Sequence, residues 1–278
     1  MKFFNKIIKN KKLILIIDIL LLIIAIKYCK YIYYFELQKA IFTGELERFS
    51  EENETPMFKV GKIVLYSSAN ATDNSDGKLE NISISQFTDI AIYIDNKSFT
   101  KEITAENTVK EIYIDDIKII SNLEEGEKIF NYKNPNYFGR YLNLKNYENE
   151  KIQLNVITTN QELNNSDYNN NVFFTDCSNP LTLGFINKDF IKNGKVSDTS
   201  GQLQFDGSIL RNAKANLTEL SGKIQFFIHI KNNLGEDFIC SLVIKNDLTQ
   251  DEENLLNGYS IKIYEPDDQT YNFLKIGK

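Results

Sequence analysis

Histidine is nearly absent from this chain, in which His229 is the single one among 278 residues. A metal site built from several histidines is therefore excluded within one subunit, because such a site needs two or more imidazole ligands. His229 shares a face with Gln225 and Phe227, opposite the apolar residues of the same alternating segment. The sequence favours a half-exposed strand residue over a metal ligand at this position, and we expect no bound metal or other cofactor.

Cysteine and tryptophan are scarce as well, with three cysteines and no tryptophan in the chain. There is no Cys-x-x-Cys pair, and Cys177 and Cys240 alone do not make a disulfide framework. A single disulfide between these two stays open. Because Cys240 alternates with Phe238 and Leu242, a buried, inert thiol is the default interpretation. The lack of tryptophan argues against a specialised carbohydrate-binding module.

Long apolar runs are limited to one, Leu13 to Ile26 (LILIIDILLLIIAI). As a helix this run covers about 21 Å, and counting on to Phe35 gives about 34 Å, enough for a hydrocarbon core of about 30 Å. Lys27 and Lys30 lie in the extension and would direct their ammonium groups to the headgroups. The extension also carries tyrosines of the kind found at membrane interfaces, namely Tyr28, Tyr31, Tyr33 and Tyr34.

The lysines around this run predict its orientation. Five precede it, and only Lys27 and Lys30 follow closely, so by the positive-inside rule the N-terminus stays cytoplasmic. No small-x-small cleavage pair follows the apolar core, which favours an uncleaved anchor over a signal peptide. We expect a single-pass membrane protein with four parts: a basic cytoplasmic tail (1–12), a transmembrane signal-anchor helix (13–35), a helical stalk (36–56) and an extracytoplasmic β-rich domain (57–278).

Asp18 is a carboxylate within the predicted membrane span. A charge there costs about 2.5–3.5 kcal/mol on insertion scales, which the surrounding Leu and Ile residues outweigh. Two interpretations stay open. The carboxyl is either tolerated in protonated form, or it makes a polar contact with another transmembrane helix.

The part of the chain beyond residue 35 is acidic. Residues 1–35 hold seven of the 32 Lys and Arg residues and one of the 38 Asp and Glu residues, which leaves 25 basic and 37 acidic residues and a net charge of −12. This charge repels nucleic acid and anionic lipid headgroups, so we expect no nucleic-acid partner. It would attract cations or basic partners, although acidity of this size is more often a device for solubility.

From Met57 onward, apolar residues recur with period two, the pattern of strands with one buried and one wet face. No amphipathic helix longer than the stalk interrupts them. The sequence therefore predicts an all-β, β-sandwich-like ectodomain, as one large or two packed sandwiches. The expected strands include Phe58–Ser67, Ile90–Ile94, Lys128–Tyr132, Ile152–Val156, Leu181–Ile186, Leu203–Phe205, Tyr259–Ile263 and Tyr271–Ile276.

Two segments predict local features of the β structure, a bulge and a hairpin. The apolar phase of Glu111–Ile120 slips at Asp115-Asp116, which predicts a β-bulge there or else a fully buried strand. Gly222–Lys231 and Glu236–Lys245 form a matched pair joined by a short loop. We expect a hairpin with Gly235 at positive φ.

The sequence contains no motif that would assign a catalytic activity. The chain has no G-x-S-x-G, no Gly-rich phosphate loop and no EF-hand spacing, and acidic chains always contain carboxylates that could form a hydrolytic pair. We name no catalytic residue.

An aromatic cluster in Ile129–Leu142 is the candidate binding element, through Tyr132, Tyr137, Phe138 and Tyr141. These side chains either fill the core or form an exposed platform for sugar rings or a partner protein.

The function that the sequence favours is a non-catalytic binding or interaction module of the cell envelope, with a protein or glycan partner. An envelope glycan hydrolase with an unidentified carboxylate pair is one alternative. The other is an accessory subunit of a membrane complex, in which Asp18 and the tyrosines after the span make the contacts.

Overall fold

The computed structural model describes residues 18–29, 32, 57–75, 80–96, 104–132, 145–157, 171–173, 180–195, 208–248, 253–256, 258–265 and 271–277. The chain divides into two compact units, Met1–Glu54 and Thr55–Lys278.

In the first unit, a helix covers residues 18–29, and its side chains, Asp18 and Cys29 included, are exposed. Within the described part of the chain, no helix combines the length and the hydropathy needed to cross a membrane. The expected span of residues 13–35 extends beyond the described helix at both ends. The expected stalk (36–56) lies wholly outside the described residues, and both expectations stay predictions.

The second unit is built almost entirely of strands. They are β1 (Phe58–Asp73), β2 (Ile82–Asn96), β3 (Val109–Ser121), β4 (Glu127–Tyr132), β5 (Ile152–Ile157), β6 (Asn171–Phe173), β7 (Leu181–Gly194), β8 (Gly222–Asn232), β9 (Asp237–Asn246), β10 (Ser260–Tyr264) and β11 (Leu274–Gly277). In the described part of this unit, three short helices accompany them: α4 (Ser208–Asn212), the 3-10 helix η3 (Leu217–Leu220) and α5 (Glu253–Leu256). The expected strand at Leu203–Phe205 lies outside the described residues.

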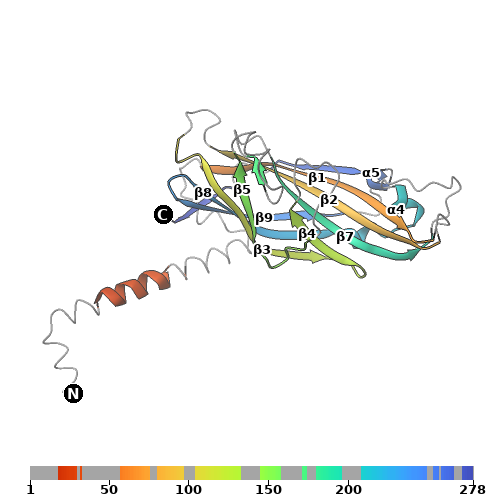
Figure 1. Ribbon diagram of the computed structural model, residues 1–278, viewed down its shortest axis with the longest axis horizontal. Coiled ribbons are helices and arrows are strands. Elements are labelled where there is room, and N and C mark those ends of the chain that lie inside the picture. The colour runs from red at the N-terminus through yellow and green to blue at the C-terminus, as the bar shows by residue number, and fades with distance from the viewer. Residues whose placement is uncertain are drawn as a thin grey trace, which may run out of the picture. The chain divides into compact units, whose positions relative to one another are not determined.

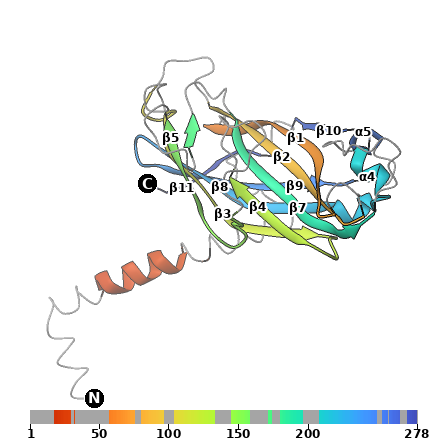
Figure 2. The same ribbon diagram turned by 45° about the vertical axis from the view of Figure 1, so that its right-hand side comes forward.

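The strands form two sheets that pack face to face (Figures 1 and 2). One has the order β10-β1-β2-β7-β4, and the other has the order β11-β9-β8-β3-β5-β6. All neighbouring strands are antiparallel except β5 and β6. The predicted all-β, sandwich-like fold is confirmed.

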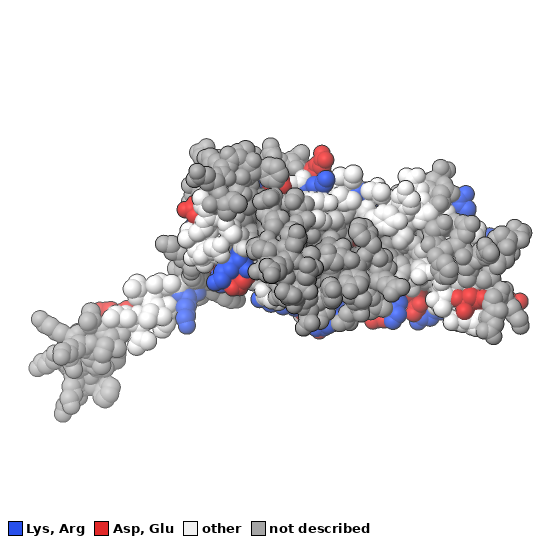
Figure 3. Space-filling model, turned by 45° about the horizontal axis from the view of Figure 1, so that its top comes forward, with Lys and Arg blue, Asp and Glu red and all other residues white. Residues whose placement is uncertain are grey.

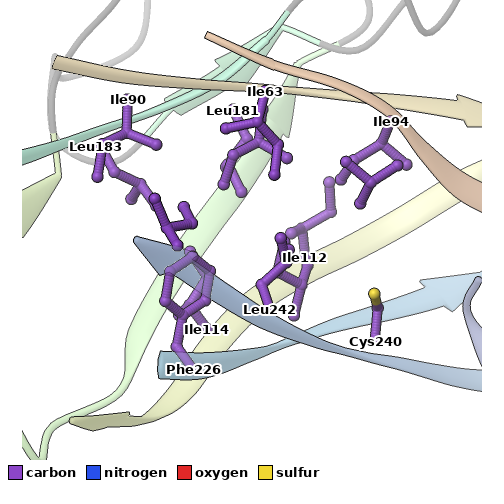
Figure 4. Packing of buried hydrophobic residues seen from close by; sticks show 14 of the residues in the cluster. Ile63, Ile90, Ile94, Ile112, Ile114, Leu181, Leu183, Phe226, Cys240 and Leu242 are labelled. Carbon is purple, nitrogen blue, oxygen red and sulfur yellow. The ribbon is translucent and has the colours of Figure 1, made fainter. Parts of the chain in front are cut away.

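The main core lies between the two sheets (Figure 4). Ile90 and Leu183 of the first sheet point toward Ile114 and Phe226 of the second, and all four are at most 1% exposed. Each fully buried side chain of this size stabilises the fold by about 1.5–3 kcal/mol. The expected alternation is confirmed in β2, where Ile90 and its neighbours Ile92 and Ile94 face inward.

A second, smaller apolar cluster fills one end of the sandwich. At this end, α4, η3 and α5 cover the inner face of β1, β2 and β7 (Figures 1 and 2). Ile82 and Ile84 of β2 pack there with Leu210 of α4, Leu217 of η3 and Leu255 of α5. The long strands need these helices because an uncovered apolar sheet face would be exposed to water.

The predicted β-bulge is confirmed. The register of β3 with β8 shifts between Asp115 and Lys118, and Asp116 adopts φ = 48°. As a result, Ile114 before the bulge and Ile117 after it are both fully buried. The extra residue restores the inward phase that a regular strand would have lost.

The predicted hairpin is confirmed as β8 and β9, which pair from Gly222–Asn246 to Lys231–Asp237, and Gly235 has φ = 79°. Asn232 organises the turn from a fully buried position. Its Oδ1 accepts hydrogen bonds from the backbone N–H groups of Leu234 (3.1 Å) and Glu236 (2.8 Å), and its Nδ2 donates to the carbonyl of Glu106 (3.0 Å).

The C-terminal segment connects the two sheets along one side of the sandwich. After β10 has paired with β1, Phe273 donates its N–H to the carbonyl of Phe58, and the chain then continues into β11 beside β9. The hydroxyls of Tyr264 and Tyr271 donate to the backbone carbonyls of Lys245 (3.0 Å) and Val243 (3.4 Å) in β9. The first of these bonds joins β9 to β10 of the opposite sheet, and the second joins β9 to the segment that precedes β11.

Candidate functional site

A group of large apolar side chains faces solvent on β10 and its neighbours. Ile261 and Ile263 are 53% and 60% exposed, Tyr259 is 53% exposed, and Tyr66 of β1 is 39% exposed. Tyr66 lies opposite Ile261 in the strand register, and its ring stacks on that of Tyr259 at 5.3 Å between centroids. We call these four residues the β10 face.

The sequence pattern predicted the opposite orientation for this strand. The alternation of Tyr259, Ile261 and Ile263 indicated a buried apolar face, yet these residues are exposed and Ser260 is buried. The reason is the anchoring of the even-numbered side chains. Tyr264 donates to the carbonyl of Lys245, and Lys262 donates to that of Asp247. A shift of one residue would turn the isoleucines to the other face of the sheet but would break both contacts.

The position of β10 in its sheet is a second property of this face. Among the strands that the structure describes, β10 pairs with β1 and stands at the end of the order of its sheet. The exposed isoleucines therefore follow the last described strand of that sheet.

Tyr66 is the tyrosine of the β10 face whose hydroxyl is partly shielded from water. Burial raises the pKa of the Tyr66 hydroxyl, and Tyr259 and Asp89 raise it further. Tyr66 therefore stays neutral at physiological pH, and the face remains apolar apart from its two hydroxyl groups.

His229 belongs to a different cluster, on the outer face of the second sheet. Its Nε2 lies 3.0 Å from Asp115 Oδ1, and because a carboxylate oxygen only accepts, Nε2 carries the proton. The imidazole stacks on Tyr113 at 4.2 Å, and the ammonium group of Lys151 lies 3.4 Å from the centroid of the same tyrosine ring.

The expected half exposure of His229 is wrong, because the residue is only 7% exposed. It does lie opposite the inward apolar set of β8, as the alternation indicated. Phe227 and Gln225 on the same face are also buried, so both faces of β8 are covered in this stretch. A ring this enclosed is poorly placed to act as a general base on an incoming substrate, although the Asp–His pair has the hydrogen bond that such a base requires.

The residues selected from the sequence are only partly described. Tyr132 is the last residue of β4 and packs, partly buried, against the main core. Tyr137, Phe138 and Tyr141 lie outside the described residues, so the aromatic platform stays a prediction. Asp18 is exposed on the helix at residues 18–29.

Cys240 is a free thiol, 2% exposed, and burial raises its pKa. The default interpretation of a buried, inert thiol therefore fits, whereas Cys177 lies outside the described residues. Within the described ranges, no group of three or more His, Cys, Asp or Glu residues could hold a metal ion.

The surface drawn in Figure 3 shows no large patch of one charge among its described residues. Among the described residues there, basic and acidic side chains lie in small mixed groups. The β10 face is thus the most distinctive exposed feature of the described sandwich. No protein-family model, no curated protein and no solved structure matches this chain.

Proposed function

We propose that this chain is a single-pass membrane protein whose β-sandwich lies outside the cytoplasm and binds an extended polypeptide of the cell envelope through the β10 face. The protein is then a non-catalytic interaction module, which includes the role of an accessory subunit. The observation that carries this proposal is the exposure of Ile261 and Ile263 on β10, the last strand in the described order of its sheet.

An extended peptide is the ligand that this geometry favours. Lying along β10, it would place alternate apolar side chains against Ile261 and Ile263. A glycan would instead need open aromatic ring faces. Tyr66 and Tyr259 stack on each other, which occupies one ring face of each, so a polypeptide fits better than a sugar.

The membrane anchor is supported by the described part of the N-terminal helix. Nearly all of its large apolar side chains are exposed, from Ile19 to Ile26, with no separate polar face. A helix that is apolar all round is stable only when it is buried, in a protein core or a bilayer. The lysines that precede it favour a cytoplasmic N-terminus and an exported C-terminal unit.

Site-specific photocrosslinking in intact cells tests this binding mode. A photoreactive amino acid at position 263 of the full-length protein should give a discrete crosslinked protein, and the crosslinked peptide should contain alternating apolar residues. The matched control is position 120, because Ile120 of β3 is equally exposed (59%) but lies on the other sheet.

The substitution Ile261→Lys provides the second control. It should abolish the crosslink from position 263, because a lysine would set a charge against the apolar side chains of the peptide, and it should leave the protein's abundance unchanged. Identical products from positions 263 and 120, or a product that glycosidases remove, would contradict the proposal.

A further inference from the structure

A belt of neutral polar side chains crosses the interior of the sandwich between its two apolar clusters. Its hydrogen-bonded members come from both sheets, and all are at most 3% exposed. They are Ser67 of β1, Gln86 and Thr88 of β2, Asn187 of β7 and Asn246 of β9. Buried polar groups of this kind are stable only if their donors and acceptors are matched.

Most of the belt is matched. Thr88 Oγ1 accepts hydrogen bonds from Gln86 Nε2 (2.8 Å) and Asn246 Nδ2 (3.1 Å), which uses both lone pairs, so its proton is directed to Ser67 Oγ at 3.0 Å. Gln86 uses its second amide proton on the carbonyl of Phe87 (2.8 Å). The hydroxyl of Thr88 is therefore saturated.

Asn187 has an acceptor left over. Its Nδ2 donates to Gln86 Oε1 (2.8 Å) and to the carbonyl of Leu220 (3.3 Å), and both of these oxygens can only accept. The amide therefore cannot be turned round without losing both bonds. In this orientation the buried Oδ1 accepts no hydrogen bond from any residue that the structure describes.

Asn246 has the same deficit. With Nδ2 toward Thr88, its Oδ1 has no donor among the described residues. Each unmatched buried group destabilises the folded state.

We infer that the belt is a binding site for buried water, which donates hydrogen bonds to Asn187 Oδ1 and Asn246 Oδ1. Water supplies two donors in a small volume, and buried waters typically bond to polar groups left over in the interior. A cation would also satisfy the oxygens. The belt, however, holds no carboxylate to balance a buried charge, so water is favoured.

A crystal structure of the full-length protein at about 1.5 Å resolution tests the inference without any substitution. The expected result is an ordered peak at about 2.7–3.0 Å from each of the two Oδ1 atoms. A single peak that contacts both would also support it. The distance of 2.8 Å between Asn187 Nδ2 and Gln86 Oε1 should be retained, which checks the amide orientation in the same map.

Two results would overturn the inference. One is a map with no density within hydrogen-bond distance of either oxygen. The other is a peak at about 2.3–2.6 Å surrounded by six or more oxygens, which is the geometry of a calcium ion.

Discussion

Asn246 of one sheet donates a hydrogen bond from its Nδ2 to Thr88 Oγ1 of the other sheet, over 3.1 Å and between two buried side chains. This bond joins the sheets at the point where the main core gives way to the smaller apolar cluster. It therefore replaces, at that level of the sandwich, the apolar contacts that hold the sheets together elsewhere.

Replacing Thr88 by valine tests the contribution of this bond. Valine keeps the shape of threonine but removes the hydroxyl, which leaves Asn246 Nδ2 without its acceptor and removes one acceptor from Gln86. We expect the free energy of unfolding to fall by about 1–3 kcal/mol, measured by denaturant unfolding. Thr72→Val, at an exposed position of β1, is the matched control and should change it by less than about 0.5 kcal/mol. Equal stability of the two variants would show that the belt contributes little.

Asn232→Ala should destabilise the β8–β9 hairpin. The substitution removes the acceptor of the N–H groups of Leu234 and Glu236 and the donor to the carbonyl of Glu106. A loss of about 1–3 kcal/mol is expected, because these backbone groups would lose their partners. Asn233→Ala changes the exposed neighbouring residue, whose backbone N–H donates to Thr108, and should be nearly neutral. Similar losses in both variants would contradict the role given to the Asn232 side chain.

Asp116 should tolerate glycine but not valine. Its φ of 48° lies in the left-handed region, which costs an ordinary residue about 1–2 kcal/mol and a β-branched residue more. We expect Asp116→Gly to match or exceed the stability of the parent protein and Asp116→Val to lose at least about 1 kcal/mol in thermal or chemical unfolding. Valine being accepted as well as glycine would mean that the bulge relaxes to a regular strand.

The buried thiol of Cys240 should make the fold sensitive to mild alkali. Burial raises its pKa in the folded state, whereas in the unfolded chain it ionises near pH 8.5. The unfolded state therefore loses a proton that the folded state keeps, and stability falls as the pH rises above that value. Between about pH 8 and pH 9.5 we expect a loss of about 1 kcal/mol through this residue.

Cys240→Val removes the ionisable group and should flatten this pH dependence by the same amount. The window ends below pH 10, near which Tyr66 and Tyr271 ionise in the unfolded chain, and in the folded state the pKa of each is raised. An unchanged slope in the variant would show that Cys240 ionises in the folded protein.

Local patterns in the sequence were sufficient for the bulge and the hairpin. The phase slip at Asp115-Asp116 and the matched apolar sets around Gly235 depend only on neighbouring residues, so the structure confirms both. The short helices α4, η3 and α5 were missed, because four or five residues are too few to show a helical period.

Tertiary contacts decide the features that the sequence did not predict. The orientation of β10 follows from bonds that Tyr264 and Lys262 make with the end of β9 and the residue after it, far away in the chain. His229 is buried because its side of β8 is covered as well as the inner side, which alternation along one strand cannot reveal. The β10 face, which is the candidate site, is exposed because of this orientation of β10.

The location of the β-sandwich is the central claim, and cysteine accessibility in intact cells tests it most directly. In a background of Cys29→Ser and Cys177→Ser, where Cys240 is buried, one variant carries Leu234→Cys at the exposed tip of the β8–β9 hairpin and another carries Lys2→Cys. A membrane-impermeant maleimide should label the Leu234→Cys variant in intact cells and the Lys2→Cys variant only after lysis. Labelling of the Leu234→Cys variant only after lysis would place the sandwich in the cytoplasm and contradict the account.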